Sequence, residues 1–134
     1  MKTAFKTGCV LSILTAALHL VGHFQEPRPE NDQERQLLEL MRGLRFDAGG
    51  VTRSMQDILG GLSLSFTVLM LLMGVHGLLI ARAGDARLVR TSAWVYAAAA
   101  TAVTAIGVVC FPTPAFVCTG LVGAAYLVAS RARS

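Results

Sequence analysis

The chain has 134 residues, of which 54% are hydrophobic and 15% are charged, and its formal net charge is +4. Soluble domains are typically about 45–50% apolar and about 25% charged, so this composition favours a membrane protein over a soluble one. The positive charge does not indicate a nucleic-acid partner, because the basic residues stand at the ends of apolar runs rather than in one cluster.

The first apolar segment, residues 7–24, predicts a transmembrane helix, because about 20 residues rising ~1.5 Å each cross the ~30 Å hydrocarbon layer. A signal peptide is the alternative, but the segment lacks a small-residue cleavage site. One face of this helix is small and polar, and it is expected to point into the bundle rather than to lipid. That face carries Gly8, Ser12, Thr15, His19, His23 and Glu26.

Residues 26–57 are too long for a simple turn between two helices. They carry seven acidic and five basic residues, so this connection is not basic on balance. Within it, residues 31–45 predict an amphipathic helix that Asn31 or Asp32 caps. We expect this outer segment to lie in the membrane interface. A cap over the bundle and a moving lid are the alternatives.

The glycine pair at 49–50 predicts a break after the amphipathic helix, since glycine adopts positive φ without strain. The second span is predicted over residues 58–81. Ser54 and Asp57 have the spacing of a capping box at its start, with Thr52 as a rival cap. Capping therefore competes with catalysis as the role of Asp57.

Two further spans are predicted over residues 91–110 and 115–130, the last of them starting after Pro112 or Pro114. Both contain faces of small residues, which predict close packing inside the bundle, with a homodimer as the alternative. These faces are Ala93, Ala97, Ala100, Thr104 and Gly107 in the third span, and Gly120 and Ala124 in the fourth. Three aromatic residues are expected to anchor at the inner interface: Trp94, Tyr96 and Tyr126.

The basic residues in short flanks predict the orientation. An even number of crossings puts all of them on one side: Lys2, Lys6, Arg82, Arg87, Arg90, Arg131 and Arg133. Because positive flanks stay in the cytoplasm, both termini are expected to be cytoplasmic, in a bacterial inner membrane. The predicted fold is all-α: residues 1–134 form one membrane domain, a four-helix transmembrane bundle with the amphipathic outer segment between spans one and two.

The three histidines are predicted to lie near opposite faces of the membrane. His19 and His23 are four residues apart, so they share a helix face near the outer side. His76 follows Asp57 by 19 residues, roughly 28 Å along a helix, so it belongs near the inner side. This separation argues against a metal or haem site that joins all three. We therefore expect no metal ion and no other cofactor.

Further polar residues gather with the histidine pair at the outer ends of spans one and two. The structural interpretation is a satisfied hydrogen-bond network at the interface. The functional interpretation is a protein that binds a lipid or a partner subunit there, with Glu26, Asp47 and Arg53 as candidate ligand-binding residues. Self-association into a homo-oligomer is a further alternative.

The alternative function is a membrane enzyme that performs acid–base, isomerase-like chemistry on an apolar substrate. His19 or His23 would be the base, and Asp57 or Glu26 its partner, because an imidazole beside a carboxylate moves protons near neutral pH. A cavity that reaches both His19 and Asp57 would favour this enzyme, whereas a filled interior would favour binding.

Short motifs run through the first half of the chain. They are His19-Leu-Val-Gly-His-Phe24, Pro29-x-Asn31, Leu38-x-Leu-Met41, Phe46-Asp-x-Gly49, Arg53-Ser-Met-x-Asp57 and Gly61-Leu-Ser-Leu-x-Phe66. In this pattern the chain resembles an uncharacterised family of small four-helix bacterial integral membrane proteins. The resemblance implies no activity. It implies that the outer-facing region is the distinctive part of the molecule.

Overall fold

The computed structural model describes residues 1–111 and 113–132. Pro112, a predicted helix start, and Arg133, one of the basic residues used to predict orientation, lie outside the described residues, as does Ser134. The described part of the chain forms the following elements: α1 (Lys2–His23), α2 (Asp32–Gly43), β1 (Arg45–Ala48), β2 (Val51–Ser54), α3 (Met55–Ala83), α4 (Ala86–Cys110) and α5 (Thr113–Arg131). The all-α fold class is confirmed, and the short β-hairpin is an addition that the sequence did not predict.

Four of the helices, α1, α3, α4 and α5, are long and apolar enough to cross a membrane. All four begin before the predicted apolar spans, and polar caps rather than the edge of an apolar run start α3 and α4. The Asp85 carboxylate, for example, accepts hydrogen bonds from the backbone N–H groups of Arg87 and Leu88 at 2.8 and 3.1 Å. Capping of this kind satisfies amide groups that have no partner within the helix.

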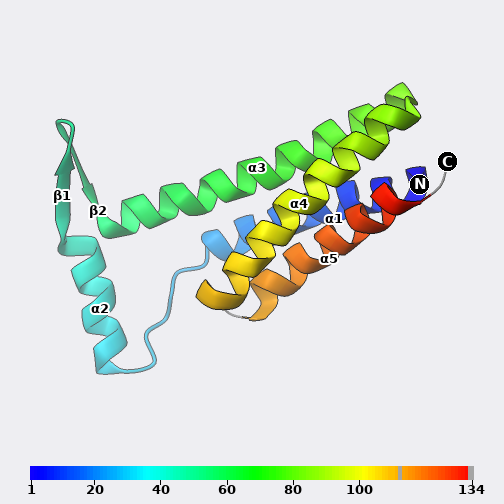
Figure 1. Ribbon diagram of the computed structural model, residues 1–134. Helices are drawn as coiled ribbons and strands as arrows, with labels where there is room; N and C mark the ends of the chain where they lie inside the picture. Colours follow the sequence, from blue (N-terminus) through cyan, green and yellow to red (C-terminus); the bar gives the residue numbers. More distant parts are fainter. Residues whose placement is uncertain (112, 133–134) are drawn as a thin grey trace.

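The four long helices pack in the order α3, α1, α5, α4, so that α1 lies between α3 and α5 (Figure 1). Gly84, with φ of 81°, lets the chain turn sharply from α3 into α4. Beyond that turn α3 and α4 diverge and touch little. We call the end of the bundle that carries α2 and the hairpin the hairpin end, and the opposite end the terminal end.

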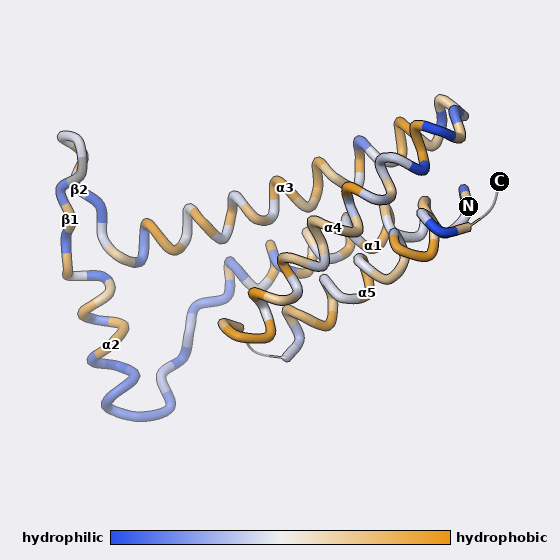
Figure 2. Tube along the Cα trace, in the orientation of Figure 1, coloured by the Kyte–Doolittle hydropathy of each residue, from blue (hydrophilic) through white to orange (hydrophobic). Residues whose placement is uncertain are grey.

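Many buried side chains of the bundle are small, such as Ala93 and Ala97, although Phe5 and Tyr126 are also fully buried, and many large apolar side chains face outward. Large apolar residues such as Leu69 and Val109 are 66% and 84% exposed. Figure 2 shows that apolar residues dominate all four long helices, while the polar residues gather in the connections. Soluble proteins rarely expose so much continuous apolar surface, which lipid would cover in a bilayer. The chain is therefore built as a multi-pass membrane protein.

Glycines bring α1 close to its neighbours. A Cβ atom on Gly74 of α3 would lie 2.6 Å from Ile13 Cγ1 and 2.7 Å from the Cys9 carbonyl oxygen. A Cβ atom on Gly8 would lie 2.8 Å from the ring of Tyr126. All three distances are shorter than the contacts that real Cβ atoms make, so only glycine fits at Gly74 and Gly8. Close backbone approach of this kind is how helices gain packing energy in lipid.

The predicted inward faces are confirmed in part for α1 and α4 and are wrong for α5. His19, His23 and Thr104 are half-buried, and Glu26 lies beyond α1 and is exposed. Gly8, Ser12 and Thr15 of α1 are buried, as are Ala93, Ala97, Ala100 and Gly107 of α4. In α5, Gly120 is half-buried and Ala124 is exposed. The buried face there is Thr119, Val122, Gly123, Tyr126, Ala129 and Ser130. The prediction for α5 assumed that small residues mark the buried face, and it failed because the buried face contains the large Tyr126.

The two tyrosines are not the interface anchors that the sequence suggested. Tyr126 is fully buried, and its hydroxyl is hydrogen-bonded to Ser12 Oγ at 3.2 Å. Tyr96 is half-buried, and its hydroxyl is hydrogen-bonded to His76 Nδ1 at 2.7 Å. A tyrosine can be buried in this way when its hydroxyl finds a partner. Trp94 is 46% exposed and is the one of the three that remains free to face the interface.

The close contact at Gly74 predicts a strong effect of one added methyl group. Gly74→Ala should lower the unfolding free energy by about 1–3 kcal/mol, because the methyl group meets the α1 backbone, which cannot yield easily. Thermal unfolding in detergent, followed by circular dichroism, measures this. Gly61→Ala in the same helix is the control, since nothing lies within 4 Å of a Cβ atom there. Equal midpoints for the two variants would refute the packing argument.

Candidate functional site

The segment between α1 and α3 forms a small assembly at the hairpin end. Its first element, α2, begins at Asn31, whose Oδ1 accepts a hydrogen bond from Glu34 N at 2.9 Å. Glu34 returns the contact, because its carboxylate accepts from Asn31 Nδ2 at 2.9 Å and from Glu30 N at 2.7 Å. Of the two predicted caps, Asn31 and Asp32, the structure therefore uses Asn31.

Helix α2 is amphipathic, and its apolar face is only partly covered by protein, since Leu38 and Met41 are half-buried. No residue of α2 is buried, and Leu40 is 66% exposed. α2 makes its contacts mainly with the start of α3 and with β2. Figure 1 shows α2 running across the direction of α3. It stands where an interfacial helix would lie if α3 crosses the bilayer.

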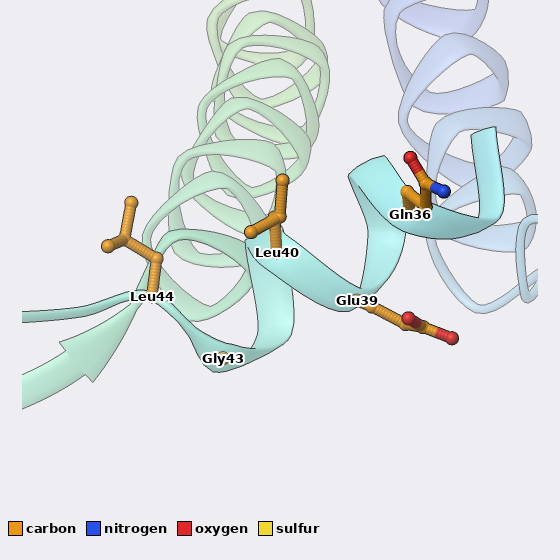
Figure 3. Close-up of a pocket in the computed structure, with 5 residues that line it drawn as sticks. All are labelled: Gln36, Glu39, Leu40, Gly43 and Leu44. Atoms are coloured by element: carbon orange, nitrogen blue, oxygen red, sulfur yellow. The ribbon is translucent and has the colours of Figure 1, made fainter. Parts of the chain in front are cut away.

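An open groove of about 610 Å³ runs along this helix and is lined by Gln36, Glu39, Leu40, Gly43 and Leu44. Figure 3 shows Leu40 and Leu44 pointing to the side on which α3 and α1 rise, while Glu39 points away in another direction. The apolar face of α2 is thus turned toward the membrane-spanning part of the molecule.

The hairpin joins α2 to α3 through a two-residue turn. Gly49 and Gly50 have φ of 64° and 80°, which confirms the predicted positive values and which non-glycine residues rarely adopt. In the antiparallel register, Arg53 lies opposite Phe46, and Asp47 lies opposite Thr52. The structure therefore places Asp47 and Arg53, two predicted ligand-binding residues, on exposed positions of the hairpin.

Asp57 caps α3. Its carboxylate accepts a hydrogen bond from Ser54 N at 2.9 Å, and its own N–H donates to Ser54 Oγ at 3.1 Å. This reciprocal pair is the capping box that the sequence predicted. The Asp57 carboxylate is therefore engaged in capping the first turn of α3.

The histidine pair of α1 converges on one hydroxyl group of α3. Ser63 Oγ is hydrogen-bonded to His23 Nδ1 at 3.1 Å and to His19 Nε2 at 3.4 Å. The His19 ring also meets the edge of Phe66, with ring centroids 4.8 Å apart. Gly60, one turn before Ser63, faces His23 Cε1 and leaves room for that ring. We call Ser63, His19 and His23 the serine–histidine cluster.

The structure brings the two histidines together but brings none of the predicted acidic partners to them. Asp57 precedes Ser63 by six residues, roughly 9 Å along the helix. Glu26 lies in the exposed chain after α1. Over residues 1–111 and 113–132, no carboxylate is hydrogen-bonded to either imidazole. The arrangement thus supports binding at this end better than acid–base chemistry between a histidine and Asp57.

His76 lies far from the histidine pair. It follows Ser63 by 13 residues, roughly 20 Å along α3, and it bonds to Tyr96 instead. This agrees with the predicted separation of the three imidazoles. Among the residues that the structure describes, no three His, Cys, Asp or Glu side chains are arranged to hold a metal ion.

Ser63 is the residue of this cluster that the sequence prediction missed. A signal for it exists, because positions 60, 63, 67, 70, 74, 77 and 81 alternate in steps of three and four along α3. All of these positions are partly or fully buried. Such spacing marks one helix face, and Ser63 stands on it near the predicted outer end.

Comparison with protein-family models, with curated proteins and with solved structures finds no match. The resemblance to a family of small four-helix bacterial membrane proteins therefore stays a prediction. Function has to be argued from the geometry of this chain.

The shared hydroxyl predicts that Ser63 holds the last turn of α1 against α3. Ser63→Ala should raise amide hydrogen exchange over residues 19–23 by roughly three- to tenfold, because one hydrogen bond contributes about 0.5–1.5 kcal/mol. Mass spectrometry of the protein in nanodiscs measures this exchange. Ser65→Ala is the control, since the Ser65 hydroxyl donates to its own helix at the Gly61 carbonyl, 2.8 Å away. Equal exchange in both variants would show that the contact is dispensable.

Proposed function

We propose that this is a multi-pass protein of a bacterial inner membrane, with both termini in the cytoplasm, that binds a phospholipid at its outer face. The binding site is the corner between α2 and the hairpin-end half of α3. The observation that carries the proposal is the orientation of α2, whose exposed leucines point toward the spans rather than to water.

The length of α3 supports this placement. Its 29 residues extend about 43 Å, so about 13 Å exceed a hydrocarbon layer of ~30 Å. With the terminal end at the inner boundary, the first turns of α3 reach the outer head-group layer and carry α2 with them. There α2 can lie at the interface, with Leu37, Leu40 and Leu44 turned toward the glycerol region of the lipid.

Apolar side chains on α3 continue the surface below α2. Ile58, Leu59 and Leu62 are all exposed. The glycerol region of a lipid that stands along this part of α3, with its acyl chains continuing beyond Leu62 toward the terminal end, would cover them. The corner therefore suits a lipid that stands parallel to α3.

Arginines at the same end suit the phosphate of the head group. Arg42 lies in the last turn of α2, and its Nε donates to Gln56 Oε1 at 3.0 Å, which ties the side chain to the first turn of α3. Arg45 and Arg53 stand on opposite faces of the hairpin, because the register pairs Arg45 with Ser54 and Arg53 with Phe46. A guanidinium group binds phosphate oxygens with two parallel hydrogen bonds, so Arg42 together with one hairpin arginine favours a phospholipid over a neutral lipid.

The leucines of α2 give a direct test. In a variant that combines Leu40→Gln and Leu44→Gln, phospholipid bound per protein should fall at least about tenfold, because the two lost leucine contacts together remove more than about 1.4 kcal/mol. Native mass spectrometry of protein extracted in mild detergent measures the bound lipid.

The matched control is Glu39→Gln, in the same helix but pointing away from the spans. It should keep the lipid of the unaltered protein. Unaltered protein without bound phospholipid, or equal lipid in both variants, would refute the proposal. A dimer without lipid would indicate that a second chain covers this face instead.

The orientation has its own test, in protein whose three cysteines are replaced by alanine. With Glu39→Cys, whose side chain points away from the spans, a membrane-impermeant maleimide should label intact cells whose outer membrane has been opened. With Arg87→Cys, labelling should require lysis, because this residue lies at the α3–α4 turn on the terminal end. The reverse pattern would invert the proposed topology.

A further inference from the structure

The Ser63 hydroxyl behaves differently from the other helical hydroxyl groups near it. Ser12, Ser65 and Thr67 all donate to a carbonyl of their own helix four residues earlier. Ser63 instead uses its hydroxyl with the two imidazoles of α1. A serine hydroxyl beside a histidine nitrogen is the pairing that activates a serine nucleophile.

The depth of Ser63 matches one particular chemical group of a phospholipid. About 20 residues of α3 cross the hydrocarbon layer, and counting back from Ala83 at the terminal end reaches Ser63. His23, the last residue of α1, lies at the same level because it contacts Ser63. The boundary between hydrocarbon and head group is where the glycerol ester bonds of a phospholipid lie.

We propose that the serine–histidine cluster is a catalytic site that cleaves a fatty-acyl ester bond of the lipid held at this face. The inference rests on the proposed function, because the lipid bound beneath α2 is the substrate. All three side chains are half-buried, so they are held by packing and remain open on one side. The site therefore differs from a buried structural hydrogen bond.

The reaction is an acyl transfer with water as the second reactant. Ser63 Oγ forms a bond to the ester carbonyl carbon while His23 Nδ1, 3.1 Å away, takes the hydroxyl proton. The bond between the carbonyl carbon and the glycerol oxygen then breaks, and His23 returns the proton to that oxygen. Water attacks the acyl-serine in the same way, which releases the fatty acid and restores Ser63.

His19 supplies the second imidazole. Its Nε2 lies 3.4 Å from Ser63 Oγ, so in the tautomer that carries a proton there it can donate to the carbonyl oxygen as that oxygen becomes negative. The edge contact with Phe66 fixes the ring in this direction. His23 is thus the base, and His19 stabilises the charge.

A serine-reactive probe tests the assignment directly. Protein in nanodiscs made of equal parts phosphatidylethanolamine and phosphatidylglycerol is treated with an alkyl fluorophosphonate, and covalent labelling is followed by intact-protein and peptide mass spectrometry. The unaltered protein should gain one label on the peptide that contains Ser63. Release of fatty acid from the nanodisc lipids is measured in parallel.

The variants separate catalysis from structure. Ser63→Ala should abolish both labelling and fatty-acid release. His23→Gln, which keeps a hydrogen-bonding side chain, should slow labelling by roughly 10²- to 10⁴-fold. Ser65→Ala should react like the unaltered protein, because its hydroxyl is bonded within α3 and faces away from the histidines. Circular dichroism of each variant confirms that it is folded.

Failure of this inference is distinguishable from failure of the proposed function. Bound phospholipid with no label on Ser63, or with labelling that survives Ser63→Ala, overturns the catalytic assignment and leaves lipid binding in place. A label on Ser63 without bound phospholipid, and with no fatty acid released, overturns the lipid substrate.

Discussion

The architecture depends on the absence of a hydrophobic driving force between helices that are already surrounded by lipid. In that setting helices gain energy from close packing and from hydrogen bonds between their side chains. The contacts of α1 show both effects. Gly8 and Gly74 admit neighbouring side chains and backbone that any larger residue would exclude, and Ser12 and Ser63 are hydrogen-bonded to Tyr126 of α5 and to the two histidines of α1. Large leucines and valines are left for the lipid.

Much of the fold could be predicted because the membrane imposes simple rules on sequence. Uncharged runs of sufficient length located the four long helices, and polar caps such as Asn31 and Ser54 located two helix starts. The hairpin was missed because two four-residue strands carry no alternating pattern that stands out from a loop. The sequence also could not predict which helices pack against each other, since apolar periodicity indicates which face is inside but not which helix covers it.

The candidate site was predicted in part. The i, i+4 spacing of His19 and His23 correctly put both rings on one face of α1. Proximity in the predicted topology then suggested acidic partners, and the structure gives Asp57 to the cap of α3 instead. Ser63 is a common residue type at an unremarkable position, so only the packing of α1 on α3 revealed that two imidazoles share it. The direction in which the apolar face of α2 points is likewise something that a helical wheel does not supply.

The packing of α1 against α5 has a consequence for how the chain is made. The hydrogen bond between Ser12 and Tyr126 joins residues 114 positions apart, and Gly8 meets the same tyrosine ring. Because α1 is synthesised before α5, the hydroxyl-bearing stripe of α1 has no partner until α5 enters the bilayer. A chain that stalls before α5 would expose that stripe to lipid. Closure of this α1 face therefore depends on a helix that reaches the membrane three spans later.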